Sequence, residues 1–335
     1  MQTSKKLLIR LSSAGDVLLT SPLLKIIRER EPDSEIHFVV KSSYADLVRL
    51  NPNVDRLHLV QEGADIHELE RLRKELISER FELTLDLHNN FRSVYLRRGT
   101  APEIRVITKD IFKRTLLVRT KFNFFRSVRP VALKYAQTYD SSVTEVPRPE
   151  VFVAPETIAA SDRLWTAGGK DSRPSVFLCP GARHFTKRWP ANYWRTLTES
   201  LTKDYRVVLL GSIEDSDLCH DIANGLDVYD FAGRLSIMES TAMLTRASAV
   251  VTNDSYLMHA ANALGKKVVA LFGSTVREFG FFPYAVENRV LEVDGLSCRP
   301  CSHIGLEECP RSHFKCMMET TPQAVEAAVR ALLKS

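Results

Sequence analysis

The chain has 335 residues, of which 44% are hydrophobic and 26% are charged, and its formal net charge is +5. This composition is that of an ordinary globular protein, and the length is typical of two domains of roughly 150 residues each. Apolar runs stay well short of the roughly 20 residues that span a bilayer, and the N-terminal segment lacks the pattern of a secretory signal peptide. We therefore expect a cytoplasmic protein.

The first strand and the turn after it contain the first candidate functional residue. A strand is expected at residues 5–11, followed by small residues, Asp16 and an amphipathic helix over residues 17–30. Asp16 then belongs to a turn at the carboxyl end of a strand, where ligands bind in open α/β sheets. The pattern leaves two roles open for its carboxylate, which either caps the helix or contacts a substrate.

A second polar turn follows later in the first half. Further strands are expected at 35–40, 55–60 and 82–87, with a charged helix at 66–80. The last of these strands leads into a turn that contains Asn89 and Arg92 and that we expect at the same sheet edge. A basic segment with four phenylalanines then occupies residues 109–129. Its mixture of cations and apolar groups suits an amphiphilic acceptor or a membrane surface, with a solvated helix as the alternative.

Three prolines between residues 146 and 155 indicate a linker. We accordingly expect a first domain at 1–150, a second at 151–320 and a C-terminal helix at 321–335. The second domain repeats the alternation of strands and helices, with strands expected at 176–179, 206–210, 228–231, 249–252 and 268–272. Arg183 and Lys187 follow the first of these strands and Glu214 follows the next. A lysine at such a turn suits a departing phosphate, whose developing negative charge it stabilises.

Residues 249–274 form the clearest strand, helix, strand unit of the chain. Asp254 and Ser255 stand where the N-cap of its helix belongs, and the free N–H groups of such a helix suit a phosphate. His259 lies four residues after Ser255, on the same face of the helix. A lone helical histidine is more often a packed or surface residue than a ligand, but beside this cap it is a candidate contact to an anionic ligand.

Four of the six cysteines fall in one C-terminal window. They are Cys298, Cys301, Cys309 and Cys316. In a cytoplasmic chain this spacing favours a metal site, with a structural zinc as the candidate, or a thiol cluster, over structural disulfides. The remaining two, Cys179 and Cys219, are expected to be buried hydrophobic residues.

Several segments together resemble glycosyltransferase family nine, the heptosyltransferases of bacterial lipopolysaccharide core synthesis. They are SSAGDVLLTSPLL, DLHNNFRS, PGARHFTKRWP and TNDSYLMHAANALGKKVVALFGST, in the family's order over nearly the whole chain. The resemblance implies the GT-B fold, which is two Rossmann-like α/β domains with a cleft between them. It also implies an inverting transfer of a heptose or related sugar from an ADP-sugar to a lipopolysaccharide core or similar glycan acceptor, with no cofactor required.

Matching the motifs residue by residue, the resemblance makes Asp16 the general base and Lys187 the residue that stabilises the departing nucleotide diphosphate. Donor-binding roles are assigned to Arg183, Glu214, Asp254, Ser255 and His259, and acceptor-binding roles to Asn89 and Arg92. Tyr256 departs from the family pattern, which has a glycine there, and adds bulk where the donor is expected.

The expected partners are an ADP-sugar donor and a lipid-linked or glycan acceptor, with peripheral contact to the inner membrane. Two other functions remain open at this point: a nucleotide-sugar epimerase of the same architecture, and a basic, zinc-containing nucleic-acid-binding protein. Nucleic acid is disfavoured as a partner, because the chain has no continuous basic stripe and its aromatic residues are scattered.

Overall fold

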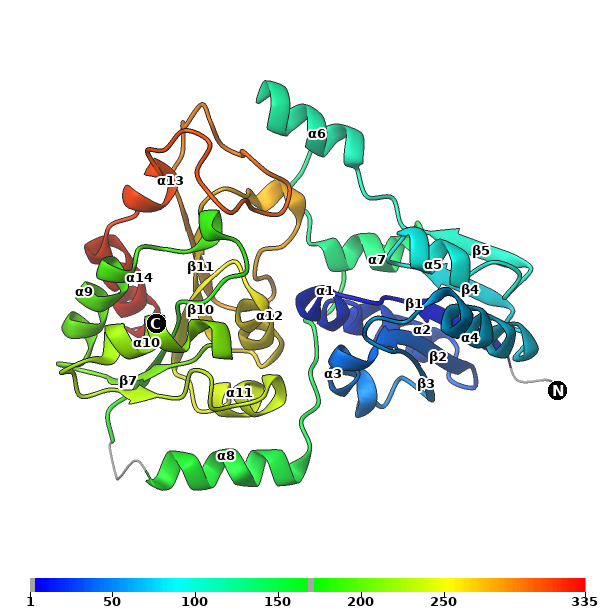
Figure 1. Ribbon diagram of the computed structural model, residues 1–335, viewed down its shortest axis with the longest axis horizontal. Helices are drawn as coiled ribbons and strands as arrows, with labels where there is room; N and C mark the ends of the chain where they lie inside the picture. The colour runs from blue at the N-terminus through cyan, green and yellow to red at the C-terminus, as the bar shows by residue number, and fades with distance from the viewer. Residues whose placement is uncertain (1–3, 168–171, 335) are drawn as a thin grey trace. The chain divides into compact units, whose positions relative to one another are not determined.

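The computed structural model describes residues 4–167 and 172–334. Internal contacts divide the chain into two compact units, one comprising Met1–Lys109 and Val131–Phe152 and the other Asp110–Pro130 and Val153–Ser335. Each unit is built on one parallel sheet (Figure 1). Among the helices of the described ranges, none has both the length and the apolar character needed to span a bilayer.

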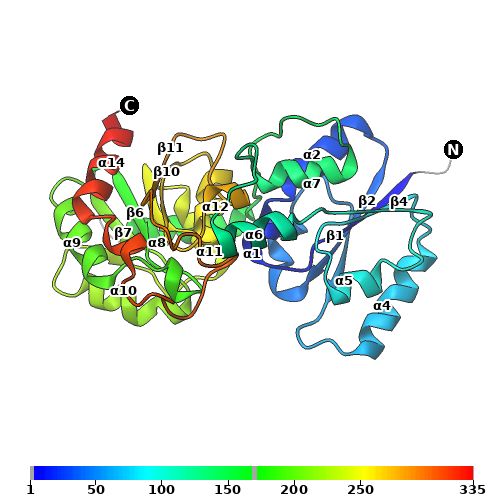
Figure 2. The same cartoon turned by 90° about the horizontal axis from the view of Figure 1, so that it is seen from above.

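The first unit contains a five-stranded parallel sheet in the order β3-β2-β1-β4-β5. Its strands are β1 (Lys5–Ile9), β2 (Glu35–Lys41), β3 (Arg56–Val60), β4 (Leu83–Asp86) and β5 (Glu103–Val106). Helices α4 (Ile66–Ser78) and α5 (Phe91–Leu96) cover one face, and α2 (Ser21–Arg30) and α7 (Val131–Tyr139) cover the other (Figure 2). Short helices η1 (Ser42–Tyr44) and α3 (Asp46–Arg49) follow β2. Leu7 and Ile9 of β1 pack with the leucines of α4 in the buried core of the first face.

The single helix predicted for residues 17–30 was wrong, because the structure has two helices there. Helix α1 (Ala14–Leu18) begins after the N-cap Ser13, and α2 begins again at Ser21 with Pro22 in its first turn. Proline has no N–H to donate and clashes with the preceding turn, so it fits the start of a helix and not its interior. Asp16 therefore lies within α1, three residues after the cap.

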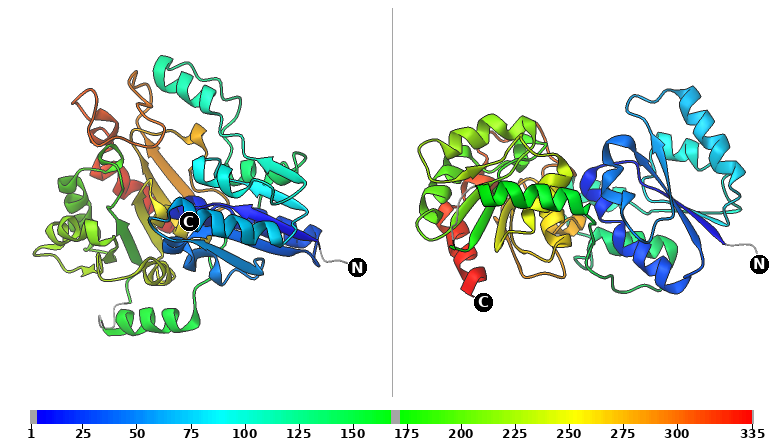
Figure 3. Two further views of the ribbon diagram at one scale, coloured as in Figure 1. Left: turned by 45° about the vertical axis from the view of Figure 1, so that its right-hand side comes forward. Right: turned by 90° about the horizontal axis from the view of Figure 1, so that it is seen from below.

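The second unit contains a six-stranded parallel sheet in the order β11-β10-β9-β6-β7-β8. Its strands are β6 (Ser175–Cys179), β7 (Arg206–Leu209), β8 (Tyr229–Asp230), β9 (Ala249–Asn253), β10 (Lys267–Phe272) and β11 (Asn288–Glu292). Helices α9 (Ala191–Leu201), α10 (Ser216–Ala223) and α14 (Pro322–Lys334) bury one face of this sheet. Helices α11 (Ile237–Leu244) and α12 (Tyr256–Ala263) lie on the other, and α8 (Pro155–Ala167, green) packs along α11 (Figure 3). The short helices are η2 (Phe185–Lys187), η3 (Ile213–Asp215), η4 (Arg277–Phe279) and α13 (Lys315–Met318).

Residues 110–130 belong by their contacts to the second unit, although the predicted first domain included them. They contain α6 (Ile111–Thr120). The Arg114 side chain donates a hydrogen bond to the carbonyl of Phe279 at 3.0 Å, and Lys121 Nζ donates to the carbonyl of Pro300 at 2.7 Å. These partners are more than 160 positions away in the sequence. Such long-range bonds leave no mark on local residue patterns. The proline-rich segment at 146–155 therefore gave no indication that residues 110–130 pack with the second unit.

Candidate active site

In each sheet the strand order reverses at one place, and polar turns are found there. The reversal lies between β1 and β4 in the first sheet and between β6 and β9 in the second. Ligands of open α/β sheets bind beyond the carboxyl ends of strands at such reversals, because the two neighbouring loops diverge and leave a crevice. Asp16 and Asn89 follow the first pair of strands, and Lys187 and Asp254 follow the second.

In the first unit, Asp16 is held by three neighbours. Its carboxylate pairs with Arg10, whose Nη2 lies 2.6 Å from Oδ1. The Tyr135 hydroxyl lies 3.1 Å from the same oxygen, and the Ser13 hydroxyl donates to Oδ2 at 2.8 Å. Ser13 also directs its backbone N–H to this carboxylate, so Asp16 does take part in capping α1. The side chain remains 17% exposed, which leaves it accessible to a ligand.

Two opposing effects act on the pKa of Asp16. Burial raises this pKa, but the positive charge of Arg10 and the hydrogen bonds from Ser13 and Tyr135 outweigh burial, so the pKa lies below the ordinary value of 3.8. At neutral pH Asp16 is therefore a carboxylate. These four interactions use about all the acceptor sites of a carboxylate, so Asp16 acts as a base only when one of its present partners gives way to the acceptor hydroxyl.

Asp86 organises the turn that contains the candidate acceptor residues. This fully buried carboxylate accepts hydrogen bonds from the backbone N–H groups of His88, at 2.9 Å, and Asn89, at 2.7 Å. Asn89 adopts a left-handed backbone with a φ of 48°, a conformation that asparagine tolerates better than most residues. Arg92 follows in the first turn of α5 and is half-buried.

His88 is a candidate ligand contact to which sequence reasoning gave no role. Burial lowers its pKa to about 4, and the charges of Arg10 and Lys109 lower it too, so the ring is neutral at neutral pH. Its Nδ1 is buried and has no hydrogen-bond partner in the described ranges. In the sequence, a role for His88 is indicated only by its position directly after a buried strand. The burial of its ring and its cationic neighbours depend on tertiary structure.

In the second unit, Lys187 and Asp254 form a largely buried ion pair. Lys187 Nζ lies 2.7 Å from Asp254 Oδ2, and the two side chains are 16% and 7% exposed. The hydroxyl of Thr275, which follows β10, donates to the same carboxylate oxygen at 2.9 Å. Turns after β6, β9 and β10 thus contribute one residue each to a single polar cluster, of which Thr275 was not anticipated.

Asn253 explains why these turns meet. Its side-chain amide donates to the carbonyl of Pro180 at 2.6 Å and accepts a hydrogen bond from the backbone N–H of Trp189 at 3.2 Å. The residue at the end of β9 therefore fixes both ends of the loop that contains Lys187. Because Asn253 is fully buried, loss of these bonds would leave polar groups unsatisfied inside the unit.

Helix α12 begins directly beside this cluster. Ser255 is its N-cap in an extended conformation, and His259 is buried one turn later with its ring against Phe281. The Tyr256 hydroxyl lies 2.8 Å from Thr241 of α11. The far end of the tyrosine is thus held by the neighbouring helix, which limits the crowding at this turn that the loss of glycine led us to expect.

Arg183 is exposed in the same loop as Lys187, and Glu214 is exposed on the turn after β7; in the described ranges neither is paired with Lys187 or Asp254. Next to Glu214, Asp215 fills the space beside two glycines at the strand ends. A Cβ added to Gly181 would lie only 2.2 Å from an Asp215 carboxylate oxygen. Asp215 thus has a packing role in this turn, and the donor-binding role of the exposed Glu214 stays a prediction.

The four clustered cysteines all lie in the second unit as free thiols, and the other two, Cys179 and Cys219, are buried as expected. Within residues 4–167 and 172–334, no group of three or more His, Cys, Asp or Glu side chains could hold a metal ion in the positions that these side chains now occupy.

Solved structures confirm the predicted fold class. The glycosyl transferase family 9 structure from Veillonella parvula aligns with a TM-score of 0.83 at 21% identity, covering 100% of this chain and 99% of its own. The structure of E. coli ADP-heptose lps heptosyltransferase II aligns with a TM-score of 0.76 at 23% identity, covering 98% of both chains. The molecule is a GT-B protein with two Rossmann-like domains.

The family follows from the sequence match. The model of glycosyltransferase family 9 (heptosyltransferase) matches residues 69–310. The chain is also 24% identical over 359 residues to lipopolysaccharide heptosyltransferase 2 of Escherichia coli (strain K12), covering 98% of each. The chain belongs to glycosyltransferase family 9 and is a glycosyltransferase, as its motifs predicted. This membership favours transfer over the epimerase and nucleic-acid-binding alternatives.

Proposed function

We propose that this enzyme transfers a heptose from ADP-heptose to a lipopolysaccharide core acceptor, with inversion at the anomeric carbon. The observation that supports it most directly is the Lys187, Asp254 and Thr275 cluster beside the start of α12, at the strand-order reversal of the second sheet. The relatives named above are lipopolysaccharide and ADP-heptose heptosyltransferases over 98% of their lengths.

Donor binding in this proposal rests on charge. The diphosphate takes the position where Lys187 and the N–H groups at the start of α12 offer positive charge, and Ser255 and His259 add polar contacts. Asp254 holds the lysine in place through the 2.7 Å ion pair. Arg183, from the loop that contains Lys187, and Glu214, from the turn after β7, contact the nucleoside part of the donor. No step of the transfer is assigned to a metal or another cofactor.

The chemical step is a single displacement. Asp16 accepts the proton of an acceptor hydroxyl as the oxygen attacks the anomeric carbon, and the bond from that carbon to the diphosphate oxygen breaks. The low pKa of Asp16 means that the proton moves late, when bond formation has made the hydroxyl more acidic. Lys187 stabilises the negative charge that develops on the departing ADP. Asn89 and Arg92 orient the acceptor.

The donor class is tested by thermal unfolding in the presence of ADP, UDP, GDP and their sugars. We expect stabilisation by the ADP compounds alone, since binding to the native state raises the melting temperature. Equal stabilisation by UDP compounds contradicts the donor assignment. Release of ADP from ADP-heptose only when the acceptor is present supports transfer, whereas conversion of the sugar without acceptor supports the epimerase alternative.

The base is tested by Asp16→Asn, with Ser13→Ala as the matched control that removes one hydrogen bond to the same carboxylate. We expect kcat to fall by roughly 10²–10⁴ in Asp16→Asn, because proton transfer contributes this much to typical enzymes. Stabilisation by ADP should persist, because the second unit is unchanged. Wild-type turnover in Asp16→Asn excludes the assigned role.

Residues 110–130 suit a lipid-linked acceptor at a membrane surface. Ile111, Phe112, Phe122 and Phe124 are between 56% and 78% exposed. The cations Lys113, Arg119, Arg126 and Arg129 are exposed around them, and Asp110 is the sole acidic residue of the segment. Exposed aromatic side chains beside cations are typical of segments that bind anionic lipid surfaces. We infer peripheral contact of this segment with the membrane that contains the acceptor.

This contact is tested by co-sedimentation with vesicles. We expect binding to vesicles that contain anionic phospholipid, weaker binding to neutral vesicles, and loss of binding in the double variant Phe112→Ser, Phe122→Ser. Ile158→Ser, which removes a partly exposed apolar residue of α8, should bind as the wild type does. Equal binding of the double variant and the wild type refutes the inference.

A further inference from the structure

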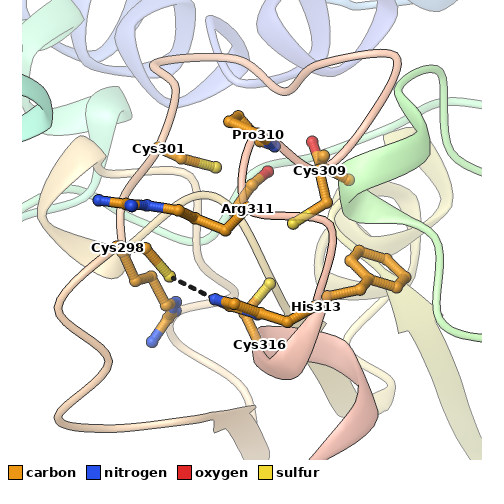
Figure 4. A pocket seen from close by; sticks show the side chains of 11 residues that line it. Cys298, Cys301, Cys309, Pro310, Arg311, His313 and Cys316 are labelled. Atoms are coloured by element: carbon orange, nitrogen blue, oxygen red, sulfur yellow. Dashed lines mark hydrogen bonds between the residues drawn. The ribbon is translucent and has the colours of Figure 1, made fainter.

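Four cysteines and one histidine of the second unit surround one small pocket (Figure 4). The lining side chains that matter here are Cys298, Cys301, Cys309, His313 and Cys316. The pocket volume is about 20 Å³, close to that of one water-sized sphere. All four cysteines are free thiols. Soft ligands from separate parts of one loop and from α13 therefore converge on a space of atomic size.

His313 acts toward these sulfurs as a hydrogen-bond donor. The backbone N–H of Lys315 donates to His313 Nδ1 at 3.0 Å, so the neutral ring carries its proton on Nε2. That nitrogen lies 3.8 Å from the Cys298 sulfur, the contact drawn as a dashed line in Figure 4. A ring N–H directed at sulfur stabilises a thiolate, as outer-shell donors do around bound metals. This tautomer makes His313 a support for a four-sulfur site and leaves the sulfurs as the ligands.

Positive charge adjoins the same pocket. Arg299 and Arg311 line it, and Lys121 Nζ donates to the carbonyl of Pro300, the residue before Cys301. Four thiolates around a divalent ion carry a net charge of −2, which Arg311 and Lys121 offset, because Arg299 is already paired with Glu292.

We propose that Cys298, Cys301, Cys309 and Cys316 bind one thiolate-preferring divalent metal ion, zinc or ferrous iron. Tetrahedral four-sulfur sites suit these two metals, with zinc–sulfur bonds of about 2.3 Å. The side chains do not lie in coordinating positions in the described structure. Rotation of the Cα–Cβ bonds between staggered rotamers reorients each sulfur within the pocket that all four already line.

The cysteine loop also supports the turn that contains Lys187. The backbone N–H of Thr186 donates to the carbonyl of Leu306 at 3.1 Å, and the N–H of Leu306 donates to the Thr186 hydroxyl at 2.8 Å. Leu306 lies between the second and third cysteines, and Thr186 directly precedes Lys187. A metal that fixes this loop therefore fixes the backbone from which the lysine extends.

The same loop supports the other side of the cluster. Arg299, between the first two cysteines, donates from Nη2 to the carbonyl of Thr275 at 2.8 Å and is paired with Glu292 at 2.6 Å. The N–H of Cys301 donates to the carbonyl of Ser274 at 3.2 Å. Thr275 is the residue whose hydroxyl bonds Asp254. We infer that the metal site is a positioning element for the donor cluster, and this second part rests on the proposed function.

Metal binding is tested on the full chain, purified under reducing conditions from cells supplied with zinc and iron. We expect elemental analysis to give about one metal ion per chain, because a four-thiolate site binds metal tightly at neutral pH. Stripped protein reconstituted with cobalt(II) should show the thiolate-to-metal charge-transfer bands of tetrahedral sulfur coordination. Protein without metal that also shows no such bands at equimolar cobalt overturns the proposal, as does a stoichiometric disulfide among these cysteines in reduced preparations.

Variants identify the ligands. Cys298→Ser and Cys309→Ser should each lose the cobalt bands, while the control Cys219→Ser, which alters a buried cysteine of α10, should keep them. His313→Ala should still bind cobalt, with affinity lower by about 10–100-fold, as expected for an outer-shell donor. Loss of the bands in His313→Ala alone, with both cysteine variants unaffected, refutes the four-sulfur assignment.

The link to the donor cluster has its own readout. Removing the metal from the wild type should reduce the stabilisation by ADP, and returning zinc should restore it. An unchanged effect of ADP on metal-free protein refutes the positioning role but leaves the metal site intact. If metal-loaded protein does not respond to ADP at all, the proposed donor is wrong, and the metal content still decides the metal proposal.

Discussion

Variants of the ion pair between Lys187 and Asp254 can show whether Lys187 acts in catalysis or only stabilises the fold. Replacing Lys187 with methionine keeps most of the side-chain volume and removes the charge. Asp254, which is 7% exposed, then retains Thr275 as a partner but has lost its counter-ion. A double variant, Lys187→Met with Asp254→Asn, removes both charges and keeps a polar group for Thr275.

The expected magnitudes follow from the burial of the pair. Two unit charges about 4 Å apart attract by about 4 kcal/mol at an effective dielectric constant of about 20, and desolvation offsets part of this. Removing one partner of a fully buried ion pair costs about 3–5 kcal/mol. Because the lysine is 16% exposed, we expect Lys187→Met to lower the free energy of unfolding by a somewhat smaller amount, about 2–4 kcal/mol. For a unit of this size that lowers the melting temperature by about 4–16 °C.

Calorimetry and turnover together decide between the two roles. The double variant should regain most of the melting temperature that Lys187→Met loses, because no unpaired charge remains. Its turnover should stay lower than that of the wild type by roughly 10²–10³, because the lysine charge is still missing. Arg246→Met is the matched control, since its partner Asp162 is 39% exposed and such surface pairs contribute at most about 1 kcal/mol. Wild-type turnover in the double variant would mean that Lys187 has only a structural role.

Two further predictions concern the neighbours of the site. Arg10→Met removes the positive charge that lowers the pKa of Asp16, so this pKa should rise, although the hydrogen bonds from Ser13 and Tyr135 continue to lower it. Because the base must be ionised, activity falls as the pH drops through its pKa, and the acidic limb of the kcat/KM profile should move to higher pH; an unmoved limb contradicts the assignment. Gly181→Ala should destabilise the second unit by about 1–3 kcal/mol, because the new Cβ meets the Asp215 carboxylate at 2.2 Å. Adding Asp215→Ala should relieve the clash in thermal unfolding, and no recovery would show that another contact is responsible.

Local patterns were sufficient where one element determines the outcome. The strand, turn and helix alternation predicted two parallel α/β halves, and the buried runs at β1, β6, β9 and β10 are near-continuous apolar sequences, as strands covered on both faces must be. The short strand β5 was not predicted, because none of its residues is fully buried and its sequence has no apolar run. Pro22 is a sufficient local signal for the break between α1 and α2, because proline fits the start of a helix.

Sequence by itself determined the class of the molecule and the turns in which its polar residues stand, because periodicity and turn chemistry are properties of neighbouring residues. Tertiary structure alone decided which of those residues meet. Arg10 and Tyr135 reach Asp16 from β1's end and α7, and Thr275 reaches Asp254 from the turn after β10. It also decided that residues 110–130 pack with the second unit and that four cysteines share one pocket. Contacts between distant positions depend on how the sheets bring chain segments together, and no local pattern records that.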